Sequence, residues 1–441
     1  MTTNRQRWLY ALANMATVIP YQAMPFAQFY YTDIKHLPVA WVSNLLFLFA
    51  FYNAANNPII GYLSDRTRTR WGRRLPFILF GTAPMAVFFT LIWVAPFDGL
   101  TQPGLLIGWF AITLIFWELG STAIGTSYFA LLPEMFVTYA ERTDIAVRMN
   151  IFQTIGLLVG VALPPILYSR IGWVPMGLSF ALVCAAAMYI GLPGMFERPE
   201  FANRPALDLL PSLKATFINR SFATIVAAYT LRYFAISTLA TGVPFYIKYS
   251  LKVDDALASA ILASAFITAG LLLWPWRQYV AHRFEARTTM MLAFLIMAAG
   301  AGLLFFVRTI GGAVAAAMLF GVGLSGMILM TDVILADIAD EDEMHTGLRR
   351  EGMYFGMNGF ITSLSFALVA LVFRWLPPAY GYDSTLTVQP DSVAIGFRLY
   401  MSLAPAAACL LAIIALYLYP LHGSRLRTVK TFRQQTFSDH L

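Results

Sequence analysis

Three amide side chains interrupt an otherwise apolar stretch of the chain. Asn53, Asn56 and Asn57 are spaced at i, i+3 and i+4, which puts all three on one face of a helix. Inside a membrane such a polar face is costly unless it meets a cavity or another helix. The three amides are therefore candidates for contact with a solute, and the alternative is a polar interface between helices.

Three of the ionisable side chains within apolar stretches are functional candidates, because an ionisable group at membrane depth is by default a functional hypothesis. Glu118 is a candidate site for a proton or another cation, unless it lies near the outer interface of the membrane. Asp332 fits an inner gate as well as solute binding. Arg232, with Tyr229 and Tyr233 on adjacent turns, fits a pair with Glu118, an anionic solute or a purely structural pair.

Neutral hydrogen-bonding side chains occur in other apolar stretches. They are Asn14, Tyr21, Gln22, Thr126, Gln153, Asn358 and Thr362. Groups of this kind suit a hydroxyl-rich solute. For each of them the alternative is a hydrogen bond between helices, worth about 0.6 kcal/mol in a membrane.

The amino-acid composition is that of an integral membrane protein. Of the 441 residues 59% are hydrophobic and only 12% are charged, against about 25% charged in soluble domains. The net charge of +7 is spread between apolar stretches rather than gathered in one patch, so we expect no nucleic-acid partner. Cys184 and Cys409 both lie in apolar stretches. Metal-ligand spacings, a catalytic triad and a phosphate-binding glycine loop are absent from the sequence, so we expect neither an enzyme nor a resident cofactor.

Twelve segments are long and apolar enough to cross a membrane as helices, which takes about 20 residues each. They are 8–31, 39–63, 76–96, 105–134, 148–170, 173–195, 221–249, 256–276, 289–307, 312–336, 352–376 and 394–420. The first is too long and too polar for a signal peptide, so we expect it to be retained as a span. The sequence therefore predicts an all-α membrane protein with twelve transmembrane helices.

The basic residues orient this arrangement. With the N-terminus in the cytoplasm, 22 of the 30 lysines and arginines fall in cytoplasmic segments, so the positive-inside rule places both termini there. The polar stretch 197–220 separates six spans from six. We expect an N-terminal half at 1–196, a C-terminal half at 221–420 and a cytoplasmic tail at 421–441.

The two predicted halves resemble each other weakly where the fourth and tenth spans end. Leu132-Pro-Glu-Met and Leu335-Ala-Asp-Ile each put an acid at the helix exit, and a Thr and an Arg follow before the next span. Two six-helix halves related by a repeat are typical of secondary transporters, which bind solute near the middle of the membrane.

Charged groups at the cytoplasmic span ends form two candidate gates. Gly61 is expected to let helices approach closely, and Asp65 to cap or pair across a tight basic loop. The residues assigned to the gates are Gly61, Asp65, Arg66, Arg70, Arg73, Glu134 and Arg142 in the first half, and Asp332, Asp337, Asp340, Glu343, Arg349 and Arg350 in the second. The alternative is that they only set topology and solubility, with a solvated acidic loop after the tenth span.

The basic loop also carries a family resemblance. Gly61-Tyr-Leu-Ser-Asp-Arg, continued by Arg68 and Arg70-Trp-Gly-Arg-Arg, resembles the loop signature of the major facilitator superfamily. Its detailed form, from Asn56-Asn-Pro-Ile-Ile-Gly to Arg70-Trp-Gly-Arg-Arg-Leu-Pro-Phe, is similar to the glycoside–pentoside–hexuronide:cation symporters, the melibiose permease group. Tyr30-Tyr-Thr-Asp, Tyr128-Phe-Ala-Leu-Leu-Pro-Glu and the stretch 336–352 agree with the same family.

The resemblance also shows where this chain departs from its relatives. Positions that hold coupling carboxylates in the melibiose permease group match Asn53, Asn57 and Gly125, and charged solute-site positions match Thr17, Asn150 and Ser363. Neutral oxygens alone hold Na⁺ weakly, and an amide cannot take up a proton. The coupling cation, H⁺ or Na⁺, therefore stays open, and Glu118 is the preferred carrier, with Asn53 and Asn57 beside it as candidates. Asn150 joins the candidate solute contacts.

Together these features predict a secondary transporter that moves a sugar-like solute across the cytoplasmic membrane by alternating access and acts as a monomer. Two alternatives stay open. One is an amphipathic or lipid-like solute carried with weak or no cation coupling, and the other is a solute sensor without net transport.

Overall fold

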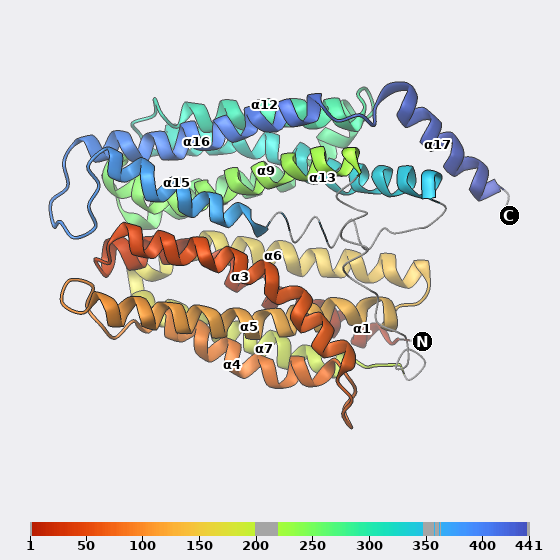
Figure 1. Ribbon diagram of the computed structural model, residues 1–441, viewed down its shortest axis with the longest axis horizontal. Helices are drawn as coiled ribbons and strands as arrows, with labels where there is room; N and C mark the ends of the chain where they lie inside the picture. The colour runs from red at the N-terminus through yellow and green to blue at the C-terminus, as the bar shows by residue number, and fades with distance from the viewer. Residues whose placement is uncertain (1, 199–218, 347–356, 358–360, 362, 439–441) are drawn as a thin grey trace. The chain divides into compact units, whose positions relative to one another are not determined.

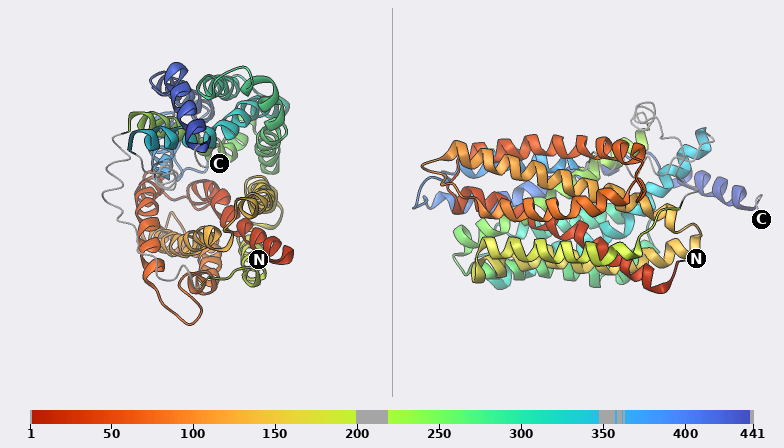
Figure 2. Two further views of the ribbon diagram at one scale, coloured as in Figure 1. Left: turned by 90° about the vertical axis from the view of Figure 1, so that its right-hand side faces the viewer. Right: turned by 90° about the horizontal axis from the view of Figure 1, so that it is seen from below.

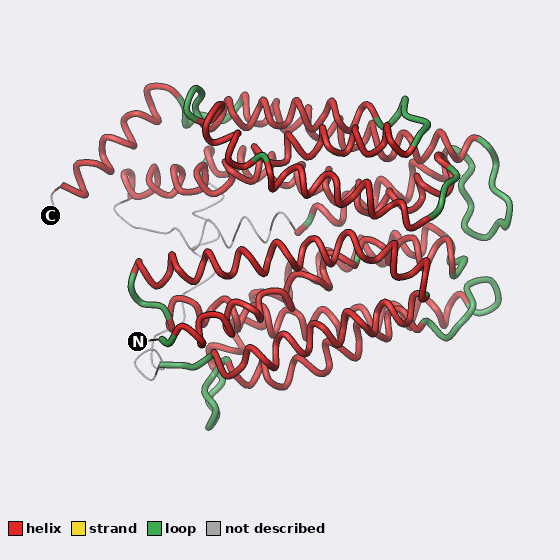
Figure 3. The backbone as a smooth tube through the Cα atoms, turned by 180° about the vertical axis from the view of Figure 1, so that it is seen from behind, coloured by secondary structure: helices red, strands yellow, loops and turns green. Residues whose placement is uncertain are grey.

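The computed structural model describes residues 2–198, 219–346, 357, 361 and 363–438, and nearly all of them are helical (Figure 3). The chain divides into two compact units. Unit 1 comprises Met1–Leu207, Val253–Ser259 and Gly381–Pro390, and unit 2 comprises Asp208–Lys252, Ala260–Tyr380 and Asp391–Leu441.

Unit 1 is built from long helices packed side by side (Figures 1 and 2). They are α1 (Asn4–Ala23), α2 (Pro25–Phe29), the π-helix η1 (Tyr30–Ile34), α3 (Val39–Arg66), α4 (Leu75–Val94), α5 (Pro103–Met135), α6 (Tyr139–Ile171), α7 (Trp173–Gly191) and the short η2 (Leu192–Gly194). Helix α5 packs against α4, α3 and α1, and α1 packs against α6 and α7.

Unit 2 contains the remaining long helices. They are α9 (Arg220–Phe245), the π-helix η4 (Tyr246–Leu251), α10 (Ala258–Leu271), α11 (Leu273–Pro275), the π-helix η6 (Trp276–Ala281), α12 (Ala286–Leu303), α13 (Ile310–Thr346), α15 (Ser365–Ala379), α16 (Ser392–Tyr417) and α17 (Gly423–Ser438). The short η5 (Asp255–Leu257) precedes α10 and belongs to unit 1. Helix α16 packs against α9 and α12, and α12 packs against α13.

The all-α membrane fold is confirmed. In the described part of the chain, ten helices are long and apolar enough to cross a membrane. The predicted span 8–31 corresponds to α1, α2 and η1, where Arg5 and Arg7 make the first turns polar. The predicted span 352–376 corresponds to α15, and most of its N-terminal part lies outside the described residues.

Two helices extend well beyond the predicted apolar limits, and a third lies in the predicted tail. Helix α6 starts at Tyr139 because Thr138 and Glu141 form a capping box, in which each side chain accepts a hydrogen bond from the other's backbone N–H. Helix α13 continues to Thr346, so the alternative of an acidic loop after the tenth span is wrong for Asp337, Asp340 and Glu343. The predicted tail contains a further helix, α17.

One helix in each unit ends in a π-helix of the same kind. Helix α2 passes into η1 and α9 passes into η4, and both π-helices begin with a tyrosine. The Tyr30 hydroxyl donates to the carbonyl of Trp93 at the end of α4, and the Tyr246 hydroxyl donates to the carbonyl of Leu304 just after α12. The left-handed residues His36 and Lys252 follow, with φ of 57° and 54°. These matched ends are a structural repeat that hydropathy alone does not reveal.

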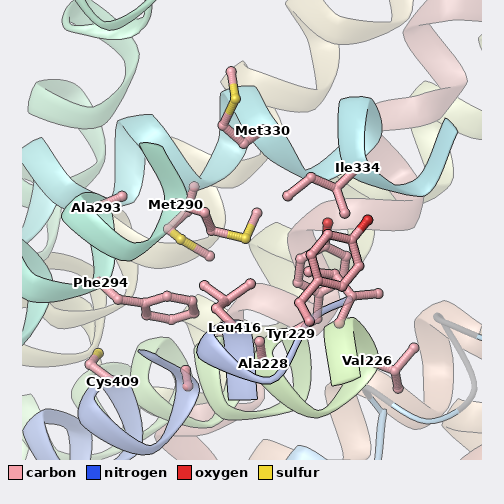
Figure 4. Packing of buried hydrophobic residues seen from close by; sticks show 14 of the residues in the cluster. Val226, Ala228, Tyr229, Met290, Ala293, Phe294, Met330, Ile334, Cys409 and Leu416 are labelled. Carbon is pink, nitrogen blue, oxygen red and sulfur yellow. The ribbon is translucent and has the colours of Figure 1, made fainter. Parts of the chain in front are cut away.

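Each unit has its own packed interior. In unit 2, Tyr229 of α9, Met290 and Phe294 of α12, Ile334 of α13 and Leu416 of α16 belong to one buried cluster (Figure 4). In unit 1 the interior is rich in aromatic rings, such as the stacked pairs Tyr31–Phe110 and Tyr10–Tyr128. Segment Gly381–Pro390 packs onto unit 1, where the Tyr382 hydroxyl donates to Asp33 over 3.1 Å.

Candidate functional site

Glu118 is a buried carboxyl group in the middle of α5, with 0% of its surface exposed. The Tyr21 hydroxyl of α1 donates to its Oε1 atom over 2.9 Å, and the Thr122 hydroxyl, one turn along α5, donates to the same atom over 3.0 Å. Its Oε2 atom is buried and has no hydrogen-bond partner among the described residues. The carboxyl group is therefore asymmetric, with one satisfied and one unsatisfied oxygen.

Aromatic side chains pack together beside Tyr21, one of the two donors to this carboxyl group. The Tyr21 ring lies 5.2 Å from the ring of Trp117, which in turn lies 6.5 Å from Phe49 of α3 and 6.1 Å from Phe89 of α4. Trp117 is completely buried. Within the described residues no lysine, arginine or histidine forms an ion pair with Glu118.

The three amides of α3 differ in their surroundings. Asn53 and Asn56 are buried, with 8% and 4% exposure, whereas Asn57 is exposed. The Asn56 amide nitrogen has no partner in the described part of the chain, and the Asn57 amide nitrogen donates to the Asn53 carbonyl over 3.2 Å. The predicted amide face is therefore partly closed off, with Asn57 at its accessible edge.

The neutral candidates on other helices have three kinds of surroundings. Asn14 is buried and its amide donates to the Met149 carbonyl, so it joins α1 to α6, and Thr126 donates to the Thr122 carbonyl of its own helix. Asn150 and Gln153 of α6 are exposed. Gln22 is half-buried and lies directly over Gly160, where an added Cβ would come within 2.6 Å of the Gln22 Cβ.

Unit 2 contains a buried guanidinium group at Arg232, which is 6% exposed. It donates to the Thr331 hydroxyl of α13 and lies over the rings of Tyr229 and Tyr233, at 5.2 and 4.6 Å from their centroids. The described residues provide no carboxylate partner for it, and its Nε atom is buried without an acceptor. Asp332, the next residue after Thr331, is exposed.

A charged cluster closes the C-terminal end of α5. Glu134 accepts from Arg73 and, over 3.0 Å, from Arg74, and all three side chains are buried. The carboxylate of Glu197 accepts from the backbone N–H groups of Arg73, Arg74 and Leu75 at 2.9, 2.7 and 3.0 Å. An anion is favoured there because the N–H groups of Arg74, the N-cap residue, and of Leu75 are left unpaired at the start of α4.

Sequence reasoning found only part of this cluster. It selected Arg73 and Glu134 but missed Arg74 and Glu197. The signal for Glu197 was weak, since α4 has no side-chain cap of its own and the carboxylate comes from residues far along the chain.

The other predicted gate residues of unit 1 lie outside the cluster. Arg66 and Arg70 are exposed and lie over the rings of Tyr62 and Trp71. Arg142 donates to the Phe136 carbonyl over 2.8 Å. The expected close approach at Gly61 is wrong, because a Cβ there would meet no atom within 4 Å. Close approach occurs instead at Gly120, where a Cβ would lie 2.9 Å from the Met85 Cβ.

The acids at the end of α13 pair with arginines from α17. Asp340 pairs with Arg433, and Glu341, which sequence reasoning missed, pairs with Arg425 over 2.7 Å. Glu341 is 2% exposed. The predicted partners Arg349 and Arg350, and the candidates Asn358 and Thr362, lie outside the described residues. Asp65 is the last residue but one of α3, and only its backbone is described.

A metal centre finds no support in the described part of the chain, where no three His, Cys, Asp or Glu side chains gather closely enough to hold an ion. A pocket in unit 2, among α9, α10, α13 and Leu304 just after α12, is lined only by apolar residues such as Leu239, Phe266 and Phe320. It offers no group that would orient a hydroxyl-rich solute.

Comparison with known proteins identifies the family. The family model described as "MFS/sugar transport protein" matches residues 9–423. The chain belongs to this family. The resemblance to the major facilitator superfamily is therefore confirmed, and the protein is a membrane transporter rather than an enzyme.

Named relatives of this MFS transporter differ in their solutes. It is 25% identical to the isoprimeverose transporter of Lactiplantibacillus pentosus, over 86% of this chain and 80% of that one. It is 23% identical to the sodium-dependent lysophosphatidylcholine symporter 1-A of Danio rerio, over 91% and 82%. The solved structure of the nucleoside transporter NupG matches with a TM-score of 0.70 at 12% identity, covering 95% of this chain and 99% of that one, which supports the fold alone.

Proposed function

We propose that this transporter carries a sugar-like solute, a glycoside or a related molecule, across the cytoplasmic membrane by alternating access. Its working parts are the N-terminal half at 1–196 and the C-terminal half at 221–420, joined by 197–220 and followed by the tail 421–441. Both termini lie in the cytoplasm, because that orientation puts most lysines and arginines inside. The protein acts as a monomer and has no nucleic-acid partner.

The observation that carries this proposal is the exposure of neutral amides within helices that can span a membrane. Asn57 of α3 and Asn150 and Gln153 of α6 all lie in candidate spans and are exposed. An exposed amide is costly at membrane depth unless it meets water, a solute or another helix. Amide groups donate and accept hydrogen bonds, as recognition of sugar hydroxyl groups requires.

The remaining candidates take different roles. Asn14 and Thr126 already make hydrogen bonds to backbone carbonyls, so we assign them to helix packing. Tyr21, Gln22, Asn53, Asn358 and Thr362 remain proposed solute contacts. Arg232 has an unsatisfied Nε–H group, so it is the proposed contact for an anionic group on the solute, such as a carboxylate.

The charged clusters at the ends of α5 and α13 are the proposed gates. Glu134 with Arg73 forms one, and Asp340 forms the other. Pairs of this kind stabilise one conformation and must separate in the other, so their strength sets the populations of the two states.

Counterflow in proteoliposomes tests the proposal. Proteoliposomes that contain the purified protein are loaded with isoprimeverose, with other glycosides or, separately, with lysophosphatidylcholine. Exchange of the internal solute for labelled external solute is then followed. We expect exchange of at least one sugar. Exchange of lysophosphatidylcholine without any sugar would favour the lipid-like alternative, which the relative from Danio rerio supports. Binding of a solute without exchange would favour a sensor.

Two variants locate the solute contacts. Gln153→Ala and Asn150→Ala should each raise KM for the exchanged sugar about tenfold, because each removes one hydrogen bond to a hydroxyl group. Ser179→Ala is the matched control, since the Ser179 hydroxyl only donates to the Met176 carbonyl of its own helix. Unchanged KM in both variants would remove α6 from the solute site.

A further inference from the structure

Two buried glutamates on one helix have opposite surroundings. Glu134 near the end of α5 is held by two arginines, whereas Glu118 in the middle of α5 has only hydroxyl partners. Their exposures are similarly small, 7% and 0%. Burial is thus shared, and the difference lies in charge compensation.

A buried carboxylate without a cationic partner is strongly disfavoured. The charge is removed if a proton binds or compensated if a metal cation binds. A cation such as Na⁺ or Ca²⁺ would need several oxygen ligands around it. The two hydroxyl groups near Glu118 instead converge as donors on one oxygen, Oε1, and leave Oε2 without any partner in the described residues.

This asymmetry fits a carboxylic acid. A protonated carboxyl group has a carbonyl oxygen that accepts hydrogen bonds and a hydroxyl oxygen that carries the proton. Oε1, with donors Tyr21 and Thr122, fits the first role, and Oε2 fits the second. Tyr21 comes from α1 and Thr122 from α5, so the protonation state of Glu118 is felt by two helices.

The groups that face Glu118 from neighbouring helices are neutral. Helix α1 contributes Tyr21, and α3 contributes Tyr52, whose hydroxyl donates to the Ile115 carbonyl. Helix α4 contains no titratable side chain. These three helices pack against α5, and the groups that they direct toward Glu118 are uncharged. They therefore do not oppose the uptake or release of a proton.

We propose that Glu118 is a proton-binding site whose loading and release couple H⁺ to transport. The proton binds Oε2, and the Tyr21 hydroxyl senses the change at Oε1, because an ionised carboxylate holds that donor more strongly than a neutral acid does. This deepens the proposed function and rests on it only for the coupling, since proton binding itself needs no solute.

Infrared difference spectroscopy tests proton binding without a solute. The purified transporter in lipid is titrated with acid and base in choline buffer, and the carboxylic C=O stretching band is followed in H₂O and D₂O. We expect a band that titrates, shifts in D₂O and is lost in Glu118→Gln. Asp340→Asn is the matched acid-to-amide control and should keep the band, because it leaves Glu118 and its donors Tyr21 and Thr122 in place. Tyr21→Phe should keep the band but displace it, because one donor to Oε1 is lost.

Two results would overturn the proposal. One is a spectrum in which Glu118→Gln removes no C=O band at any pH at which the protein stays folded. The other is a carboxylate band that responds to Na⁺ in place of choline and is lost in Glu118→Gln, which would assign the site to a metal cation. The near-isosteric glutamine should fold, and Glu118→Asp gives a second variant in which the band should shift rather than vanish.

A transport arm tests coupling separately. With isoprimeverose as the probe, an inward proton gradient should drive accumulation in the wild type, and Glu118→Gln should lower the ratio of this accumulation to counterflow at least tenfold. An equal ratio in both proteins would overturn the coupling. Lack of movement of any sugar would contradict the proposed function and leave the infrared result to decide the proton site.

Discussion

Acidic side chains at the C-terminal ends of α5 and α13 are both paired with arginines, but the arginines come from different parts of the chain. At α5, Glu134 is paired with arginines from the loop after α3, and acid and bases are all buried. At α13, Asp340 and Glu341 are paired with arginines of α17, whose side chains are 34% and 52% exposed. The first arrangement is enclosed, and the second is open to solvent on its basic side.

This difference predicts how strongly each end is held. Removal of one partner of a buried pair leaves an uncompensated charge, which costs far more than the loss of an exposed pair. The pairs at the end of α5 should therefore open less readily than those at the end of α13, whose arginines belong to α17.

The largest effect is expected for Glu134→Gln. The variant deprives Arg73 and Arg74 of a charge partner at hydrogen-bond distance and should destabilise the protein by about 3–5 kcal/mol. Thermal unfolding in detergent measures the loss. Asp340→Asn is the matched variant in unit 2 and should cost about 1 kcal/mol or less, because Arg433 is partly solvated. Equal losses would abolish the distinction between the two ends.

A smaller effect is expected for Glu197→Ala. The variant removes three hydrogen bonds to the backbone at the start of α4 and should cost roughly 2–3 kcal/mol. Trypsin should then cleave after Arg68 or Arg70 faster than in the wild type. The cleavage rate of Glu197→Gln should lie between those of the wild type and Glu197→Ala, because the glutamine amide oxygen still accepts hydrogen bonds. Unchanged cleavage in Glu197→Ala would mean that the loop is held by other contacts.

Gly72→Ala tests how tightly the loop before α4 is held, because it changes the backbone next to Glu197. Gly72 has φ of 103°, and a Cβ there would lie 2.5 Å from the Glu197 carboxylate. We expect a loss of about 1–2 kcal/mol in thermal stability. Gly61→Ala is the opposite case, since Gly61 is helical with open space around it and alanine should stabilise by up to about 1 kcal/mol. A stabilising Gly72→Ala would contradict the geometry of the loop.

The smallest effect is expected for Arg433→Gln. Its pair with Asp340 is partly exposed and should contribute about 0–1 kcal/mol. Arg425→Gln should cost somewhat more, because its partner Glu341 is buried. A larger loss of thermal stability in Arg433→Gln than in Arg425→Gln would show that burial of the acid does not control the strength of these pairs.

The sequence was sufficient for the fold class because long apolar segments have few alternatives in a membrane. It located Glu118 for the same reason, since an acid within such a segment stands out. It could not reveal Tyr21 and Thr122 as the two donors to one oxygen, because that depends on how α1 packs against α5.

Helix ends were less predictable than spans. Hydropathy ends at the first charged residues, but α6 and α13 continue through them, α6 from a capping box and α13 through residues that favour helices. Glu197 was missed because its three backbone partners lie more than a hundred residues earlier in the chain.

The paired π-helices η1 and η4 have a consequence for helical phase. A π-turn closes with an i→i+5 hydrogen bond and so holds one residue more than an α-turn. A helical wheel drawn through α2 or α9 therefore assigns the wrong face to every side chain after Tyr30 or Tyr246. Deletion of one residue within Tyr30–Ile34 would restore the α phase and rotate Asp33 away from its hydrogen bond with Tyr382. Each unit thus has one extra residue in the π-helix that follows α2 or α9. A single deletion there would rotate the end of the helix and leave the length of the preceding span unchanged.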